Sequence, residues 1–442
     1  MKKNKTIITK KIKDIIKKDK EVFLTTTRMN YPFIPESGEN DIVRDVSGNK
    51  FIDLSSFISV YNFGINNTEI KRAIEKQVQK LVHPGFTDFY AEPPIKFGEA
   101  LLKFFPKKFG KLFLSNSGTE ANEAAIKFAK LFTDRSYIIS FYNSFHGRTQ
   151  GSLSMTSSKI VQREHFGPFA NSVHVPFPYC YRCPFNQNDS KSCGFACIDY
   201  IKKYALSKEV SGKEVAGFFV EPIQGEGGYI VPPIDYFKEL KKLLEEYGIL
   251  LIDDEIQAGI MRTGKFIALH NFGVDADIYT FGKSIGGGIP MGVTVVKKGM
   301  NIPAGSHANT FGGNLLAVSA GEAMLNHIYK NKNFIEKEVK TKSELFMTRL
   351  KEMQEKYEII GDVRGIGLMI GIEFVKSKKT KQPAIDLRNR ILKQAFDNGL
   401  IMLGCGESTI RFIPAITIEK KNIEISLDII EEIIKAEDKN RA

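Results

Sequence analysis

The sequence predicts an α/β protein, with a mostly parallel central sheet in a large domain and a smaller α+β domain built from the N- and C-terminal segments. Between Lys111 and Lys283, short apolar runs alternate with helical patterns, which is typical of parallel β-α-β units. A helix-rich stretch from about Leu316 to Lys356 then leads into VRGIGLMIGIEFV, whose apolar run predicts a strand of the smaller domain. A chain of 442 residues, 42% of them hydrophobic, is long enough to bury such a core.

These patterns divide the chain into four segments. We expect a basic amphipathic arm at 1–20 and an N-terminal segment of the small domain at 21–65. The large domain is expected at 66–330, with a cysteine-rich insertion at 180–197. Residues 331–442 are expected to complete the small domain.

Two apolar runs in the large domain end in residues that suit imine chemistry. The run Ile249–Ile252 reads as a buried strand followed by Asp254 and Gln257, and Ile278–Phe281 reads as a second strand followed by Lys283. Ligands of open α/β sheets bind outside the carboxyl ends of the strands, so these side chains are expected at one crevice. Pyridoxal phosphate needs an amine for the Schiff base and a carboxylate for its pyridinium nitrogen. Either residue alone is more often a surface charge or a helix cap.

A strand, a turn and a helix start upstream predict a phosphate site. Leu112–Leu114 is the expected strand, and a helix is expected from Thr119 onward. Gly118 allows close approach of the backbone, Thr119 adds a hydroxyl, and the free N–H groups of the first turn favour an anion. The alternative is a plain helix cap with Glu120 in the first turn.

Three further segments carry residues that suit a planar, phosphorylated cofactor. After the expected strand Tyr137–Phe141, Phe145 suits stacking on a ring and Arg148 suits a carboxylate. The alternative is a core aromatic beside a surface His146. A buried run ends in Glu221 and a Gly-rich loop, and Thr310 stands before a Gly pair that suits a phosphate.

Taken together, these motifs resemble the class III aminotransferases, which are fold-type I pyridoxal-phosphate enzymes that include 4-aminobutyrate, ornithine and acetylornithine aminotransferases. The resemblance extends from about Phe51 to about Ile418. The motifs that carry it are Ser117-Gly118-Thr119-Glu120-Ala121-Asn122, Phe145-His146-Gly147-Arg148, Glu221-Pro222-Ile223-Gln224-Gly225-Glu226-Gly227-Gly228, Asp254-Glu255-Ile256-Gln257, Lys283, and His307 to Asn314.

The resemblance implies a role for each matching residue. Lys283 would bind the cofactor covalently and move the Cα proton, while Asp254 would pair with the ring nitrogen. The remaining cofactor contacts would be Gln257 to the ring oxygen, Phe145 and Ile256 on the two ring faces, Gly118 and Thr119 to the phosphate, and Thr310 reaching over from the neighbouring subunit. The enzyme is therefore expected to be a homo-oligomer, at least a dimer.

For the substrate, the resemblance implies a switch between Glu221 and Arg411, with Arg148 at the distal carboxylate. The alternative for Arg411 is a structural ion pair. The favoured reaction is ping-pong transfer of an amino group from an ω-amino acid, such as 4-aminobutyrate, to 2-oxoglutarate. An ornithine- or acetylornithine-type enzyme is an alternative. So is an amino-acid racemase or epimerase, although His146 is the one candidate that the sequence offers for a second acid–base group opposite Lys283. A third alternative is a catalytically inactive binding protein, but the presence of Lys283 and Asp254 argues against it.

Several positions depart from the family pattern. Phe57 stands where a glycine is common and Ile65 where a histidine is common, and Phe57 precedes Ile58, which lines the substrate pocket in relatives. A bulky ring there is expected to reshape the pocket. Leu315 replaces a familiar proline at a helix start.

Four of the five cysteines, Cys180, Cys183, Cys193 and Cys197, follow the spacing C-x2-C-x9-C-x3-C. This spacing suits a tetrahedral zinc site. The alternative is four reduced thiols in an insertion loop.

The net charge of +12 is concentrated at the N-terminus, because residues 1–20 hold nine Lys and two Asp. Ile8, Ile12, Ile15 and Ile16 fall on one face of a helix there, and docking on the protein's own dimer is the favoured interpretation. Binding to nucleic acid or membrane is not expected, because no aromatic-basic interleaving supports it. No signal or membrane span is recognisable, so the expected location is the cytoplasm.

Overall fold

The computed structural model describes residues 6–26, 31–169, 171–187 and 192–440. The chain forms two compact units: Thr68–Val339 is the large unit, and Met1–Asn67 with Lys340–Ala442 is the small unit. The sequence-based divisions at 65/66 and 330/331 fall near these limits. The helix α9 (Leu315–Lys356) spans the second of these limits and is kinked at Asn331, where the backbone angles are not helical.

A seven-stranded sheet forms the centre of the large unit, in the order β4-β10-β9-β8-β7-β5-β6. Neighbouring strands are parallel except where β10 meets β4 and β9, so β10 alone runs in the opposite direction. The predicted mostly parallel sheet is therefore confirmed. Its strands are β4 (Phe109–Ser115), β5 (Tyr137–Phe141), β6 (Ser172–Val175), β7 (Val215–Val220), β8 (Leu250–Asp254), β9 (Ile278–Phe281) and β10 (Gly292–Lys297).

The central strands are largely buried because helices and loops cover both faces of the sheet. Every residue of β7 and β9 is buried, as expected for parallel strands. Small residues of α5, among them Ala124 and Ala125, pack against Ile252 and Ile278 in the core of the unit. The helices of this unit are α3 (Thr68–Val78), α4 (Glu92–Leu102), α5 (Gly118–Thr133), α6 (Gln150–Met155), α7 (Ala196–Tyr200) and α8 (Tyr236–Tyr247), with a π-helix at Ile201–Glu209.

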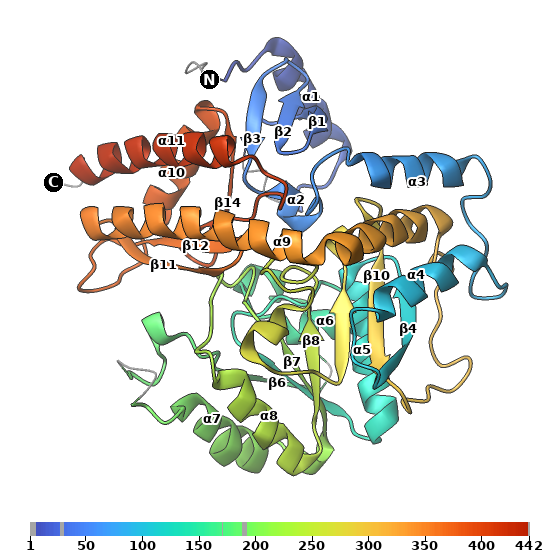
Figure 1. The fold of residues 1–442 in the computed structure, drawn as a ribbon. Helices are drawn as coiled ribbons and strands as arrows, with labels where there is room; N and C mark the ends of the chain where they lie inside the picture. Colours follow the sequence, from blue (N-terminus) through green and yellow to red (C-terminus); the bar gives the residue numbers. More distant parts are fainter. Residues whose placement is uncertain (1–5, 27–30, 170, 188–191, 441–442) are drawn as a thin grey trace. The chain divides into compact units, whose positions relative to one another are not determined.

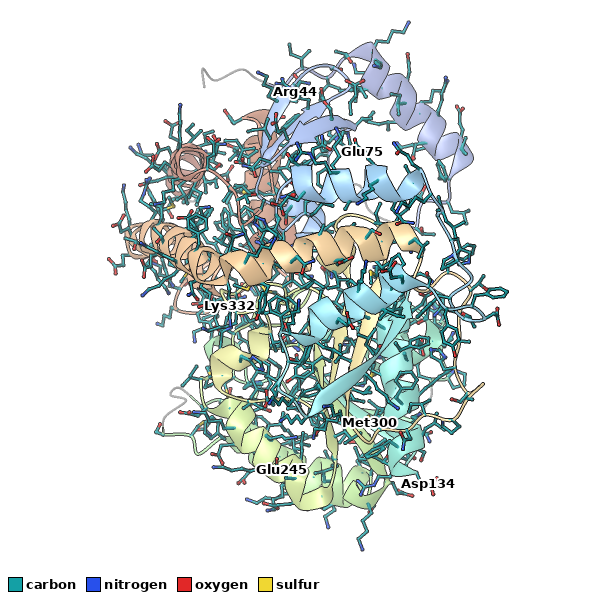
Figure 2. All side chains as sticks on the ribbon, turned by 45° about the vertical axis from the view of Figure 1, so that its right-hand side comes forward. Arg44, Glu75, Asp134, Glu245, Met300 and Lys332 are labelled. Carbon is teal, nitrogen blue, oxygen red and sulfur yellow. The ribbon has the colours of Figure 1, made fainter. Side chains whose placement is uncertain are left out.

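The starts and the carboxyl ends of the parallel strands lie at opposite ends of the large unit. Asp134 follows the C-terminal end of α5, and Glu245 lies near the end of α8, and Figure 2 shows both at the same end of the large unit. Each of these helices leads directly into a parallel strand, so this end carries the starts of the strands. The N-terminus of α5 and the carboxyl ends of β8 and β9 therefore lie at the opposite end, where α/β sheets bind their ligands.

The small unit contains two four-stranded sheets, with orders β1-β2-β3-β13 and β11-β12-β15-β14. The segment VRGIGLMIGIEFV forms two antiparallel strands and not the single strand that its apolar run predicted, because the chain turns at Gly367 with φ of 59°. The strands are β1 (Pro35–Glu39), β2 (Ile42–Asp45), β3 (Lys50–Asp53), β11 (Ile360–Ile366), β12 (Met369–Phe374), β13 (Leu400–Ile401), β14 (Leu403–Cys405) and β15 (Thr409–Phe412).

Helices cover the sheets of the small unit, and Figure 1 shows α10 beside α11. They are α1 (Lys10–Val22), α2 (Ser56–Ser59), α10 (Ile385–Asp397) and α11 (Lys420–Lys439), together with the last turns of α9. The basic helix α1 packs on its own unit, because Ile12 is buried and Ile8 contacts a cluster around Phe51 and Phe396.

The short element α2 is left-handed. All four of its residues have positive φ, with 50° at Phe57 and 63° at Ile58. A left-handed turn costs roughly 1–2 kcal/mol per non-glycine residue, so this segment is strained. Ile58, which the resemblance places at the substrate pocket, is 37% exposed within this turn.

Among the described residues, no helix is both long and apolar enough to cross a lipid bilayer.

Candidate active site

The carboxyl ends of β8 and β9 bring the predicted acid and lysine to one edge of the sheet. The two strands are parallel and in register, with Asp254 opposite Thr280. Asp254 is the last residue of β8, and Lys283 follows β9 by two positions. Lys283 has φ of 49°, a left-handed backbone conformation that is uncommon for a residue with a side chain and is often found at functional sites.

The start of α5 approaches this edge closely. Ser117 caps the helix, with its hydroxyl accepting a hydrogen bond of 3.3 Å from the N–H of Glu120. A Cβ atom on Gly118 would lie 2.8 Å from Cδ1 of Ile256, so this position needs glycine. The first turn of α5 therefore lies against Ile256, which follows the end of β8 by two positions. The first N–H groups of a helix have no partner within the helix and are available to a ligand.

Hydroxyl groups gather beside the helix start. Thr119 Oγ1 lies 2.6 Å from Ser152 Oγ and 2.9 Å from Thr149 Oγ1. Free backbone N–H groups, a helix dipole and hydroxyl donors together form the kind of site that binds a phosphate.

A buried hydrogen-bond network orients the Asp254 carboxylate. Oδ2 accepts hydrogen bonds of 2.8 Å from His146 Nδ1 and 2.8 Å from Asn122 Nδ2, and Oδ1 accepts one of 3.1 Å from the N–H of Ile256. Asn122 in turn accepts a hydrogen bond of 2.7 Å from the hydroxyl of Thr280. All three bonding side chains are buried. The network fixes the direction in which the carboxylate points and supplies donors that stabilise its charge.

These elements border one cavity of about 340 Å³. Nine residues predicted from the sequence line it, and they are Gly118, Thr119, Phe145, Arg148, Glu221, Asp254, Ile256, Gln257 and Lys283. Arg148 stacks on the neighbouring aromatic residue, with its guanidinium carbon 5.8 Å from the ring centroid of Phe145.

Three predicted site residues do not line this cavity. Thr310 belongs to the large unit but is not among the residues that border the cavity. Ile58 and Arg411 belong to the small unit, on α2 and β15. The switch between Glu221 and Arg411 therefore stays a prediction.

Burial sets the protonation of Glu221. Its Oε1 and Oε2 each accept a hydrogen bond of 2.9 Å, from the N–H groups of Phe145 and Gly225. Burial, with a smaller contribution from the charge of Asp254, raises the pKa of Glu221 to about 7, although His146 and the two N–H groups oppose the shift. A carboxyl group with a pKa near neutrality is suited to acid–base work.

Sequence reasoning assigned no role to several residues that contribute to this site, among them Asn122 and Glu226. Asn122 lies four residues beyond Gly118 on α5, so it shares a helix face with the phosphate-site residue. Glu226 lines the cavity from the Gly-rich loop and forms an ion pair with Lys159. Both stand within the quoted motifs, and the helical spacing of Asn122 was a signal that could have identified it.

The residues of the cavity fit pyridoxal phosphate. The helix start and hydroxyls suit its phosphate, the buried carboxylate suits its ring nitrogen, and Lys283 lies in the same cavity. Residues 24–434 match the family model described as aminotransferase class III. The chain belongs to the class III aminotransferase family. It is accordingly a pyridoxal-phosphate-dependent enzyme of fold type I, as the sequence predicted.

Individual proteins are also similar to the chain along nearly its whole length. The chain is 38% identical over 424 residues to a leucine/methionine racemase of Thermococcus litoralis, covering 95% of both chains. It is 36% identical to an alanine/serine racemase of Pyrococcus horikoshii, covering 96% of this chain and 90% of the relative. A solved structure of taurine:2-oxoglutarate aminotransferase from Bifidobacterium kashiwanohense, in complex with pyridoxal phosphate and glutamate, is 27% identical with a TM-score of 0.89, covering 99% and 100% of the two chains.

Proposed function

We propose that this enzyme inverts the configuration at Cα of 2-amino acids with uncharged side chains, and so acts as a racemase or epimerase. The observation that carries this proposal is the similarity to two amino-acid racemases along nearly the whole chain. The sequence alone favoured transamination because it offered no convincing second acid–base group. The carboxyl groups that line the cavity are candidates for this second group.

Inversion at Cα needs a group that removes the proton on one face and a group that returns one on the other. Bound pyridoxal phosphate supplies the electron sink for the carbanion at Cα. Asp254 would pair with the ring nitrogen of the cofactor, and the hydrogen bonds from His146 and Asn122 orient its carboxylate for this role. The Lys283 amine moves the proton at Cα on its own side.

We assign the second acid–base role to Glu221. It lines the same cavity as Lys283, it is buried, and its pKa is about 7. Glu226 lines the cavity too, but its carboxylate forms an ion pair with the ammonium of Lys159. Glu226→Gln is therefore the matched control for Glu221→Gln, since both remove one carboxylate from the same loop.

The test uses single enantiomers of leucine, methionine and alanine without any keto acid, followed by chiral chromatography. A racemase inverts many equivalents of substrate, and Glu221→Gln lowers this rate by roughly 10²–10⁴-fold, whereas Glu226→Gln lowers it far less. A reaction that stops after one equivalent per subunit contradicts racemisation. Equal losses in the two variants contradict the role of Glu221.

Transamination is the second candidate, favoured by Arg148, which lines the cavity and suits a substrate carboxylate. In that case the enzyme transfers an amino group from an ω-amino acid, such as 4-aminobutyrate, to 2-oxoglutarate, and Glu221 takes the role of switch partner to Arg411. Turnover that requires a keto acid, with no inversion in its absence, is the result that selects this candidate.

We further propose that the enzyme works as a homodimer in which Thr310 completes the phosphate site of the partner subunit. Phe311 is 60% exposed, and the large unit also exposes 69% of Phe89 and 100% of Tyr90. Apolar exposure of this kind is typical of an interface.

Mixed dimers test this arrangement. If Thr310 acts across the interface, a dimer of one Thr310→Ala chain and one Lys283→Ala chain regains one complete site with wild-type affinity for the cofactor. If Thr310 acts within its own chain, no complete site forms and the affinity stays at the Thr310→Ala level. A monomeric enzyme by light scattering also contradicts the proposal.

A further inference from the structure

The cysteine-rich segment between β6 and α7 brings its thiols to two tight turns. Cys180 begins a 3-10 turn that Cys183 follows, and in this turn the N–H of Arg182 bonds to the carbonyl of Tyr179 at 3.0 Å. Two residues with left-handed backbone, Gly194 (φ 58°) and Phe195 (φ 55°), separate Cys193 from the helix α7 that carries Cys197. Each pair therefore has the short spacing on a turn or helix start that zinc ligands commonly use.

All four thiols line one small pocket. Its volume is about 20 Å³, which is room for one water-sized body. The rest of the lining is mostly apolar and aromatic, with Pro178, Phe195 and Pro233 among its residues. The ring of Phe195 packs 6.2 Å from that of Tyr236, at the start of α8.

The four cysteines are reduced in the structure. Four thiols around an apolar pocket have no role in the cavity chemistry, but zinc can replace their protons and bind them as thiolates.

We propose that Cys180, Cys183, Cys193 and Cys197 bind one structural Zn²⁺ ion that fastens the cysteine-rich segment beside α8. Binding forms four Zn–S bonds and releases the four thiol protons to solvent. Among the described residues, no three His, Cys, Asp or Glu side chains are yet positioned to hold a metal. Binding would therefore draw the two turns together around the pocket that all four thiols line.

The test is metal analysis of the holoenzyme purified with zinc and without chelator. We expect about one Zn per chain in the wild type and less than about a tenth in Cys183→Ser and Cys197→Ser, since structural sites hold their metal tightly. Cys405→Ser is the matched control, because Cys405 is a buried cysteine on β14 of the small unit, and it should retain the zinc.

A second measurement separates loss of metal from loss of folding. The Ser variants should keep the absorbance of the bound cofactor, because the cysteines do not line the cofactor cavity, while resistance of the 177–197 segment to proteolysis falls. Wild-type enzyme with less than about a tenth of a zinc overturns the proposal. So does iron in place of zinc, or zinc retained in both Ser variants.

Discussion

The substitution Asp254→Asn tests the buried acid at the centre of the site. The carboxylate accepts three hydrogen bonds, two at Oδ2 from His146 and Asn122 and one at Oδ1 from the N–H of Ile256. An amide in its place has one oxygen and one NH2 group. The cheaper orientation keeps the oxygen toward the two side-chain donors and leaves the NH2 group facing the N–H of Ile256.

The structure sets the size of two effects. Two donors that face each other without an acceptor lower the free energy of unfolding by about 1–3 kcal/mol. The loss of the charge has a larger effect on the binding free energy of the cofactor. Opposite charges about 4 Å apart at an effective dielectric of about 20 attract by about 4 kcal/mol. That energy corresponds to roughly a 10³-fold rise in the dissociation constant of the cofactor.

The assay is a spectrophotometric titration of cofactor-free enzyme with pyridoxal phosphate. Asp253→Asn is the matched control, because Asp253 is the adjacent residue and is buried, and burial together with Glu255 raises its pKa well above the ordinary value. Its amide should leave cofactor affinity within a few-fold of the wild type. Equal affinities in the two variants would refute the role of Asp254.

Three further substitutions test the geometry around the cavity and the strained turn. Gly118→Ala should destabilise the protein by about 1–3 kcal/mol in urea unfolding, because the new Cβ would lie 2.8 Å from Cδ1 of Ile256; unchanged stability would show that the helix start is loosely packed. The raised pKa of Glu221 means that the folded protein binds this proton more tightly than the unfolded chain does. The stability it contributes is therefore full below pH 4.5 and is lost as the pH rises through about 7. The difference in unfolding free energy between wild type and Glu221→Gln should fall by about 3 kcal/mol across this range, and a flat difference would argue against the shift. Phe57→Gly should relieve roughly 1–2 kcal/mol of left-handed strain and lose about 0.5–1.5 kcal/mol of ring contact with Tyr61, 5.6 Å away. A loss of stability above 2 kcal/mol would show that the ring contact outweighs the strain.

The sequence predicted the strand ends well because parallel strands buried on both faces read as continuous apolar runs. The runs at β8 and β9 predict that Asp254 and Lys283 lie at one sheet edge, and the cavity includes both. The glycine at position 118 was predicted from its place in a strand-turn-helix pattern, and the contact with Ile256 gives the physical reason.

Other features depend on contacts that a linear pattern does not contain. Asn122 matters because its helix turn places it beside Asp254, and Glu226 reaches the cavity because a glycine-rich loop folds back. The run VRGIGLMIGIEFV carries no polar break, so the turn at Gly367 that splits it into two strands was not predicted. The expected switch between Glu221 and Arg411 concerns residues of two separate units, so no local pattern determines it and it stays a prediction.

Covalent trapping of the cofactor tests most directly whether this cavity is the active site. Borohydride reduction of the holoenzyme, followed by proteolysis and mass spectrometry, should find the reduced phosphopyridoxyl group on the peptide that contains Lys283, at close to one group per chain. The Lys283→Ala variant should carry none. A label on any other lysine, or a holoenzyme that carries no label at Lys283, would contradict the assignment of the site.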